Sequence, residues 1–224
     1  MRIIIFANGQ LADPSAEAER WIRAEDTVVA ADGGTRHAQA AGGTPQHVIG
    51  DLDSFPAAQR ERLEAAGTRF HSHPPAKDET DLELALLWAA EQPASQMIIL
   101  GALGGRPDQM LANILLLALP ELAGHDVRIV DGPWQIRLVR GGETATFNGA
   151  PDDLLSLIPL GGEASGIVTE GLAYPLREEP LRFGPARGIS NRFEAEVVRV
   201  TLASGQLWCF HRHGYGATSR SSDN

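Results

Sequence analysis

Hydrophobic and polar positions follow two different patterns along the chain, and the pattern changes near residue 131. In the first part, short apolar runs alternate with segments of helical spacing. An unbroken apolar run such as RIIIFA, at residues 2–7, is typical of a strand that is buried on both faces of a sheet. The segment that follows it has Asp13 as a cap and Pro14 in its first turn, which indicates a helix start.

The same reading extends along the first part of the chain. Strands are expected at residues 2–7, 27–32, 47–51, 68–73, 96–103 and 126–131, and helices at 13–25, 35–43, 56–67, 79–92 and 107–119. Strands that alternate with helices imply right-handed crossover units on a parallel sheet. We therefore expect an α/β domain with a mainly parallel sheet over residues 1–135.

The residues after about Asp131 form short alternating runs that are broken by Gly, Pro and Asn. The stretch WQIRLVRGGETATFNG has two such runs joined by a Gly-Gly turn, which predicts a β-hairpin. No helix is expected here. We predict a smaller all-β domain, a sandwich or a barrel, over residues 136–215, with a boundary within 132–142. The small, polar tail at 216–224 is expected to be disordered.

Composition narrows the functional classes. Of the 224 residues, 43% are hydrophobic and 21% charged, which is ordinary globular usage. The formal net charge of −10, without any basic run, argues against a nucleic-acid partner, since affinity for phosphate backbones comes from clustered Lys and Arg. A single cysteine, Cys209, excludes an intrachain disulfide. With no expected signal peptide or membrane span, we predict a cytoplasmic protein.

Four polar motifs each lie at or just beyond the end of a predicted strand, which is the ligand-binding edge of open α/β sheets. In the first, ADGG, Asp32 ends a strand, and Gly33 and Gly34 lead into a helix whose free amides can face an anion. Taken alone, this motif is better explained as a plain strand-to-helix turn.

The second motif is VIGDLDS, in which Asp51 and Asp53 point the same way if the backbone is extended. Two converging carboxylates are unstable unless a cation lies between them or one of them is protonated. A hard divalent cation with oxygen ligands is the obvious choice. The alternative is an Asx turn with both groups solvated, and the two readings are evenly balanced.

The third motif, KDETDLELAL, places Lys77 and Asp78 before a helix that starts near Thr80, with Asp81 in its first turn. Thr80 or Asp78 as the N-cap explains the acids completely, but it does not explain Lys77, which can pair with a phosphate oxygen.

The fourth motif, LGALGGRPDQ, brings glycines, Arg106, Asp108 and Gln109 to a helix start. Such a start can cradle a polyphosphate, and no helix cap requires an arginine. Histidines in two H-x-H pairs, 71/73 and 211/213, lack neighbouring Cys or helical spacing, so no zinc site is expected there.

The four motifs, in this order and spacing, resemble the thiamine pyrophosphokinase family. LLSLIPLGGEASGIVTEGL and GISNRFEAEVVRVTL resemble the β domain of that family, so that the likeness covers about residues 28–210. The resemblance implies that ATP and thiamine react to give AMP and thiamine diphosphate, with Mg²⁺. It also implies an α/β domain, a β-sandwich domain, and a homodimer whose active site lies at the subunit interface.

The resemblance also assigns roles to residues. It implies Asp51, Asp53 and Asp81 as the Mg²⁺ shell, with Asp108 as a further ligand or as the group that orients the thiamine hydroxyl. Contacts to ATP fall on Asp32, Gly33, Gly34, Lys77, Asp78, Thr80, Arg106 and Gln109, and contacts to thiamine on Ser190, Asn191 and Phe193. Two alternatives remain: a pterin diphosphokinase with a related α/β domain, which would lack the SNRF segment, and a non-catalytic sensor of thiamine or a nucleotide.

Overall fold

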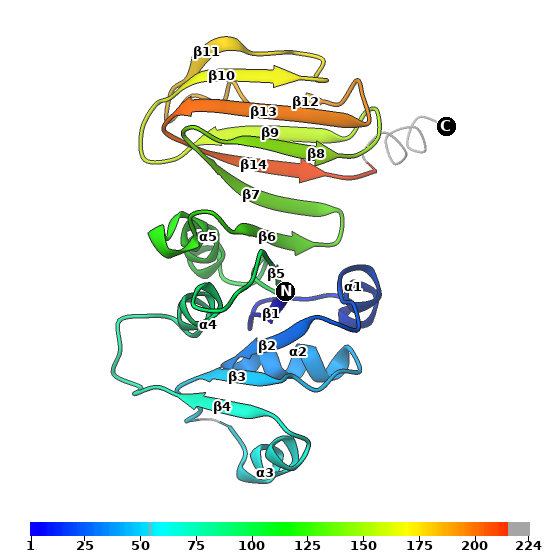
Figure 1. The fold of residues 1–224 in the computed structure, drawn as a ribbon, viewed down its shortest axis with the longest axis vertical. Coiled ribbons are helices and arrows are strands. Elements are labelled where there is room, and N and C mark those ends of the chain that lie inside the picture. The colour runs from blue at the N-terminus through cyan, green and yellow to red at the C-terminus, as the bar shows by residue number, and fades with distance from the viewer. Residues whose placement is uncertain (54, 215–224) are drawn as a thin grey trace. The chain divides into compact units, whose positions relative to one another are not determined.

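A computed structural model describes residues 1–53 and 55–214 of the chain. The tail at 216–224, which we expected to be disordered, lies outside these residues. The chain divides into two compact units, one from Met1 to Gly132 and one that begins at Pro133 (Figure 1). Among the described residues, no helix is long and apolar enough to cross a membrane.

The first unit is built on a parallel sheet, as the alternating pattern predicts. Its strands lie in the order β4-β3-β2-β1-β5-β6, and each neighbouring pair runs parallel. Their bounds are Arg2–Phe6 for β1, Thr27–Ala31 for β2, His47–Gly50 for β3, Arg69–Ser72 for β4, Gln96–Leu100 for β5 and Asp126–Asp131 for β6. The order in which successive strands are added to the sheet reverses at β1, because β2 and β5 pair with opposite edges of β1.

Helices occupy the connections between these strands. They are α1 (Pro14–Trp21), α2 (Thr35–Ala40), α3 (Ala57–Ala65), α4 (Asp81–Ala90) and α5 (Pro107–Leu115), with 3₁₀ turns at Asp32–Gly34, Leu116–Ala118 and Pro120–Leu122. All five expected helices are present, and each is shorter than its sequence pattern. The cap of α4 is Thr80, whose hydroxyl accepts a hydrogen bond from the Glu83 amide at 3.2 Å.

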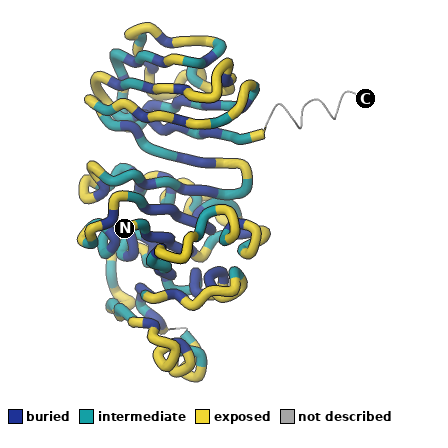
Figure 2. The backbone as a smooth tube through the Cα atoms, turned by 45° about the vertical axis from the view of Figure 1, so that its right-hand side comes forward, coloured by how far each residue is buried: buried dark blue, intermediate teal, exposed yellow. Residues whose placement is uncertain are grey.

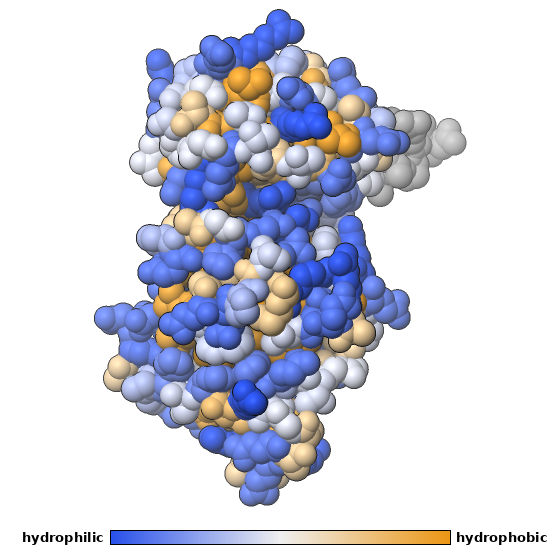
Figure 3. All heavy atoms as spheres, viewed as in Figure 1, coloured by the Kyte–Doolittle hydropathy of each residue, from blue (hydrophilic) through white to orange (hydrophobic). Residues whose placement is uncertain are grey.

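The most deeply buried residues of this unit lie on the central strands of its sheet. Ile3, Ile4, Ile5 and Phe6 of β1 are fully buried, and so are most residues of β5 (Figure 2). The helices α2 and α4 pack against β1, β2 and β3. Hydrophilic side chains cover most of the face of this unit seen in Figure 3, because its apolar side chains are used in the core.

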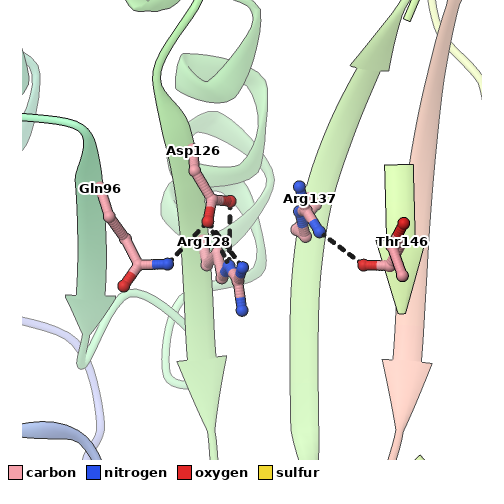
Figure 4. Close-up of polar contacts among 5 residues, drawn as sticks. All are labelled: Gln96, Asp126, Arg128, Arg137 and Thr146. Atoms are coloured by element: carbon pink, nitrogen blue, oxygen red, sulfur yellow. Dashed lines mark hydrogen bonds and ion pairs between the residues drawn. The ribbon is translucent and has the colours of Figure 1, made fainter. Parts of the chain in front are cut away.

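A polar cluster ties the start of β5 to the start of β6. The Gln96 amide donates a hydrogen bond to Asp126 Oδ2 at 2.6 Å, and the Arg128 guanidinium donates to both oxygens of the same carboxylate (Figure 4). Because Gln96 and Asp126 are also backbone partners in the parallel register, these contacts stabilise the same alignment as the ladder.

The second unit is a sandwich of two antiparallel sheets. One sheet has the order β12-β9-β14-β7 and the other β11-β10-β13-β8. The bounds are Trp134–Arg140 for β7, Thr144–Asn148 for β8, Leu154–Pro159 for β9, Ala164–Glu170 for β10, Arg177–Leu181 for β11, Asn191–Arg192 for β12, Val197–Ser204 for β13 and Gln206–Arg212 for β14. The expected fold class, α/β followed by a β-sandwich, is confirmed.

The predicted hairpin at residues 134–149 is wrong. β7 pairs with β14 in one sheet, whereas β8 pairs with β13 in the other, so the Gly-Gly turn is a corner of the sandwich. The Gly141 amide donates to Gly205 O at 2.9 Å and the Gly142 amide to Leu202 O at 2.8 Å. Two glycines specify a chain reversal but not the partner of each strand, and here tertiary pairing decided it.

Side chains from both sheets fill the space between them. Phe147, Leu157, Phe193, Val200 and Cys209 belong to one buried cluster. The Arg137 side chain on β7 also reaches the other sheet, where it donates to Thr146 O at 3.1 Å (Figure 4). Phe193 is among the largest side chains of the core, and its ring stacks on His211 with centroids 4.7 Å apart.

We expect Phe193→Ala to lower the free energy of unfolding by about 3–5 kcal/mol, because it leaves a cavity in the sandwich core. Urea unfolding followed by circular dichroism measures this change. Phe183→Ala is the matched control, since the Phe183 side chain is 63% exposed. Its effect should stay within about 0.5 kcal/mol. Equal losses in the two variants would contradict the core position of Phe193.

Candidate functional site

The loops that follow β1 and β5 form the floor of the candidate site. The Ala7 amide donates to Leu100 O at 2.8 Å, and the Gly9 amide donates to Gly101 O at 2.7 Å. A Cβ atom at Gly9 would lie only 2.4 Å from Gly101 O, so this contact requires glycine. Since β2 and β5 pair with opposite edges of β1, the site lies at the topological switch point, where open α/β sheets bind ligands.

A cleft of about 350 Å³ opens above this floor. Among the residues predicted for ATP and Mg²⁺, it is lined by Thr80, Asp81, Gly104, Gly105, Arg106 and Gln109. Asn8, Gln10, Arg36 and Asn113 also line it, and the motif analysis missed them. The Asn8-Gly9 pair directly after the first strand is the turn signal that could have pointed to this loop.

The start of α5 contributes backbone amides to the cleft. Gly104 and Gly105 have φ angles of +73° and +70°, which L side chains adopt only with strain. Arg106 is the cap residue, and its guanidinium binds both oxygens of Asp108, with N–O distances of 3.1 and 2.5 Å. This hydrogen bond lowers the pKa of Asp108. Both side chains are exposed, so Arg106 can exchange this partner for a phosphate at little cost.

The Asp32-Gly33-Gly34 turn is glycine-rich for a steric reason. A Cβ at Gly34 would lie 2.0 Å from Phe6 O, and one at Gly33 would lie 2.4 Å from the Asn8 side chain. The turn therefore packs directly on the end of β1. Asn8, Asp32, Gly33 and Arg36 line a second hollow of about 220 Å³ there.

Acidic groups gather between this turn and the start of α4. A Cβ at Gly50 would lie 2.9 Å from Asp32 Cβ and 3.1 Å from Asp81 Oδ1, so the missing side chain leaves room for two carboxylates. Lys77 Nζ forms an ion pair with Asp81 Oδ1 at 2.6 Å. Asp32 itself has an unusual backbone, with a φ angle of +39°.

The electrostatics of Asp32 indicate a place for a cation. Burial raises the pKa of Asp32, and repulsion from Asp81 and Asp51 raises it further, while the Gly33 amide and Lys77 act in the opposite direction. Asp32 Oδ1 is buried and has no hydrogen-bond partner among the described residues. A divalent cation would supply both the charge and the ligand that this oxygen lacks, so the residues fit Mg²⁺.

Asp51 and Asp53 flank Leu52, whose φ angle is +60°. The Asp53 amide donates to Asp51 Oδ1 at 3.2 Å, which is the Asx turn that we considered as the alternative. Asp51 is within electrostatic range of Asp32, while Asp53 is exposed, as is Asp78. The aspartates are neighbours rather than a closed metal shell. In residues 1–53 and 55–214, the one set of three His, Cys, Asp or Glu ligand atoms within 4.8 Å lies elsewhere, in the second unit.

The second unit carries the residues predicted to contact thiamine. The Asn191 side chain accepts from the Tyr174 amide at 3.0 Å and donates to Tyr174 O at 2.7 Å, so it holds that segment in place. Ser190 has a φ angle of +60° and precedes it. A small pocket of about 150 Å³ is lined by Tyr174, Arg187, Ile189 and Asn191.

Two of the aromatic rings in this region differ in their exposure. Tyr174 is 65% exposed, whereas Phe193 is 2% exposed with one face covered by His211. A direct contact of the Phe193 ring with thiamine stays a prediction.

Comparison with known proteins identifies the family. The model of the thiamin pyrophosphokinase catalytic domain matches residues 18–130, and that of the vitamin B1 binding domain matches residues 146–207. The thiamine pyrophosphokinase of Bacillus subtilis strain 168 is 32% identical over 179 residues, which cover 80% of this chain and 84% of that protein. The chain belongs to the thiamine pyrophosphokinase family. The resemblance seen in the four motifs is thereby confirmed.

Solved structures of thiamine pyrophosphokinases agree with this assignment. The structure of the Bacillus subtilis protein matches with a TM-score of 0.82 and 28% identity, covering 95% of this chain and 99% of that one. The structure from Geobacillus thermodenitrificans matches with a TM-score of 0.79 and 28% identity, covering 95% and 97%. The α/β and β-sandwich units of this chain therefore correspond to the family fold over nearly their whole length.

We expect Asp32→Asn to raise the melting temperature of the metal-free protein at pH 7. A raised pKa means that the folded state disfavours the charged carboxylate, so this stability penalty is present above the folded-state pKa and disappears as the pH falls below the unfolded-state value. Thermal melts at pH 7 and pH 4 in the presence of EDTA measure the effect. The gain should shrink at pH 4, and a lower melting temperature at pH 7 would contradict the charge argument.

Proposed function

We propose that the protein transfers the pyrophosphoryl group of ATP to the hydroxyl of thiamine, which gives thiamine diphosphate and AMP, with Mg²⁺ bound at the carboxylates and a homodimer as the active form. The observation that carries the proposal is the cleft at the switch point of a chain of this family. That cleft brings Gly104, Gly105 and Arg106 at the start of α5 together with Asp81. Asp32, whose buried Oδ1 has no hydrogen-bond partner among the described residues, lines the neighbouring hollow.

The residues divide into two sets by their chemistry. Asp51, Asp53 and Asp81 hold Mg²⁺, and Asp32 adds its buried oxygen to the same negative region. The contacts to the triphosphate come from Gly33, Gly34, Lys77, Asp78, Thr80, Arg106 and Gln109. Lys77 and Arg106 are now paired with Asp81 and Asp108, so ATP binding replaces internal ion pairs with pairs to phosphate oxygens.

Pyrophosphoryl transfer depends on positioning and charge neutralisation. The thiamine hydroxyl must approach the β-phosphorus in line with the departing AMP, and Asp108 at the start of α5 orients it. Arg106, Lys77 and the amides of the first turn of α5 stabilise charge on the phosphate oxygens. When bound, Mg²⁺ offsets the charge that develops as AMP leaves.

The second unit provides the thiamine surface. Ser190 and Asn191 contact thiamine at the rim of the small pocket, and the exposed Tyr174 ring offers a face for its cationic rings, with a cation–π contribution of about 0.5–2 kcal/mol. Phe193 is proposed as the aromatic of this surface, and in this chain its ring lies in the core behind Asn191. Tyr174 and Ile189, which line this pocket, are exposed apolar residues, which is consistent with a partner subunit covering this face.

The first test is the reaction itself. Purified protein is incubated with ATP, thiamine and Mg²⁺, and the products are separated by chromatography. We expect AMP and thiamine diphosphate in equal amounts, and neither in the presence of EDTA. ADP with thiamine monophosphate would mean a simple kinase. Thiamine binding in calorimetry without turnover would favour a sensor.

We expect Asp51→Asn and Asp53→Asn each to lower kcat by about 100-fold or more, because each removes a charge that holds the metal. Glu61→Gln is the matched control, since it makes the same acid-to-amide change on an exposed position of α3 and should leave kcat unchanged. Circular dichroism confirms that the folds are intact. Near-normal turnover in both aspartate variants would refute the metal assignment.

A further inference from the structure

The end of β14 and the turn before β9 bring together three potential metal ligands. The antiparallel register pairs His211 with Leu155 and Arg212 with Leu154, so His213 comes opposite Asp153 one step further along. His211 Nε2 lies 3.3 Å from Asp153 Oδ2, and His213 Nδ1 lies 3.5 Å from the same oxygen. All three ligand atoms lie within 4.8 Å of one another.

The His211–Asp153 contact is a long hydrogen bond, and both nitrogen–oxygen distances also suit a metal shell. Hydrogen bonds between nitrogen and oxygen usually measure about 2.9–3.0 Å. In a tetrahedral zinc site with metal–ligand distances of about 2.0–2.2 Å, neighbouring ligand atoms are about 3.3–3.6 Å apart. Both nitrogen–oxygen distances around Asp153 fall within that range.

Backbone amides hold the Asp153 carboxylate in place. Asp153 Oδ1 accepts a hydrogen bond from the Gly214 amide at 2.7 Å, and Oδ2 accepts one from the Ala150 amide at 3.0 Å. A Cβ at Gly149 would lie 2.5 Å from Asp153 Oδ2 and 3.1 Å from His211 Nε2, so the close approach of the backbone to both groups requires glycine.

The His211 ring is held by its aromatic neighbours. Phe193 stacks on it with an interplanar angle of 8°, and Phe147 meets it edge-on at 6.1 Å. This packing fixes the orientation of the ring, so that Nε2 faces Asp153.

Charge also favours a cation here. The carboxylate of Asp153 and the imidazole of His211 are almost fully buried. Burying a carboxylate is costly unless the charge is paired or coordinates a metal, and a cation between these three side chains would offset that cost.

We propose that Asp153, His211 and His213 form a binding site for Zn²⁺ or a similar transition-metal ion in the second unit. The sequence predicted no zinc site at the 211/213 pair, because Asp153 joins the two histidines only in the folded structure. Two imidazoles and one carboxylate suit Zn²⁺, whereas Mg²⁺ prefers oxygen ligands, so this site is chemically distinct from the acidic group of the first unit. The His213 side chain is 27% exposed, which gives the ion a path from solvent.

The site would join the end of β14 to the turn before β9. The same turn is hydrogen-bonded to Phe193, whose amide donates to Asp153 O at 2.9 Å. The ion would therefore stabilise the sandwich behind the Ser190–Asn191 surface.

The test uses the full chain without a histidine tag, stripped with chelator and then titrated with zinc chloride in a calorimeter. We expect one Zn²⁺ per chain and a higher melting temperature with zinc but not with magnesium. His213→Ala, at a partly exposed position, and Asp153→Asn should each weaken zinc binding roughly tenfold or more. His73→Ala, which removes a histidine outside the set, is the matched control and should bind as the wild type does.

Cobalt substitution gives a second readout. Co²⁺ bound by these three residues should give visible absorption bands that His213→Ala removes. Equal zinc affinity in the wild type and His213→Ala, or no binding by the wild type, would overturn the proposal. Neither readout involves turnover, so the result does not depend on the proposed activity.

Discussion

The close approach of the β1 and β5 ends is the constraint on which the first unit depends. The Gly9 amide can reach Gly101 O only because no side chain stands between them. The same contact holds the loops after β1 and β5 against each other. The cleft lies next to these loops and is also lined by residues at the start of α5. The strand order reverses at β1, and this close backbone packing leaves the cleft at the switch point, where open α/β sheets bind ligands.

Strain and unsatisfied charge concentrate around the candidate site residues. Among the described residues, Asp32, Leu52 and Ser190 are three of the five non-glycine residues with positive φ angles, and each lies in or beside a motif assigned to ligand binding. Such conformations cost roughly 1–3 kcal/mol each and persist only where the surrounding structure imposes them. In the first unit, the strained backbones of Asp32 and Leu52 lie beside the unpartnered oxygen of Asp32, which agrees with the proposal of a cation there.

The second unit concentrates its polar chemistry at one end of the sandwich. Asn191 uses its side chain to hold the Tyr174 backbone, so the position that the motif assigns to thiamine also shapes the pocket beside it. Phe193 stacks on His211, and His211 contacts Asp153, so three buried side chains form one connected row. The residues proposed to contact thiamine therefore also stabilise the sandwich. A substitution at Phe193 has to be tested for both thiamine binding and the free energy of unfolding.

The sequence by itself determined the α/β and all-β halves, the helices and strands of the first unit and the family, because periodicity and motif spacing are local properties of the chain. It left the cap of α4 open between Thr80 and Asp78, and the structure selected Thr80. Tertiary structure alone decided what depends on distant partners. It set β7 and β8 in different sheets, since a Gly-Gly turn does not select strand partners. It buried Phe193, and it brought Asp153 to His211 across 58 residues, because packing and register, rather than local pattern, create such contacts.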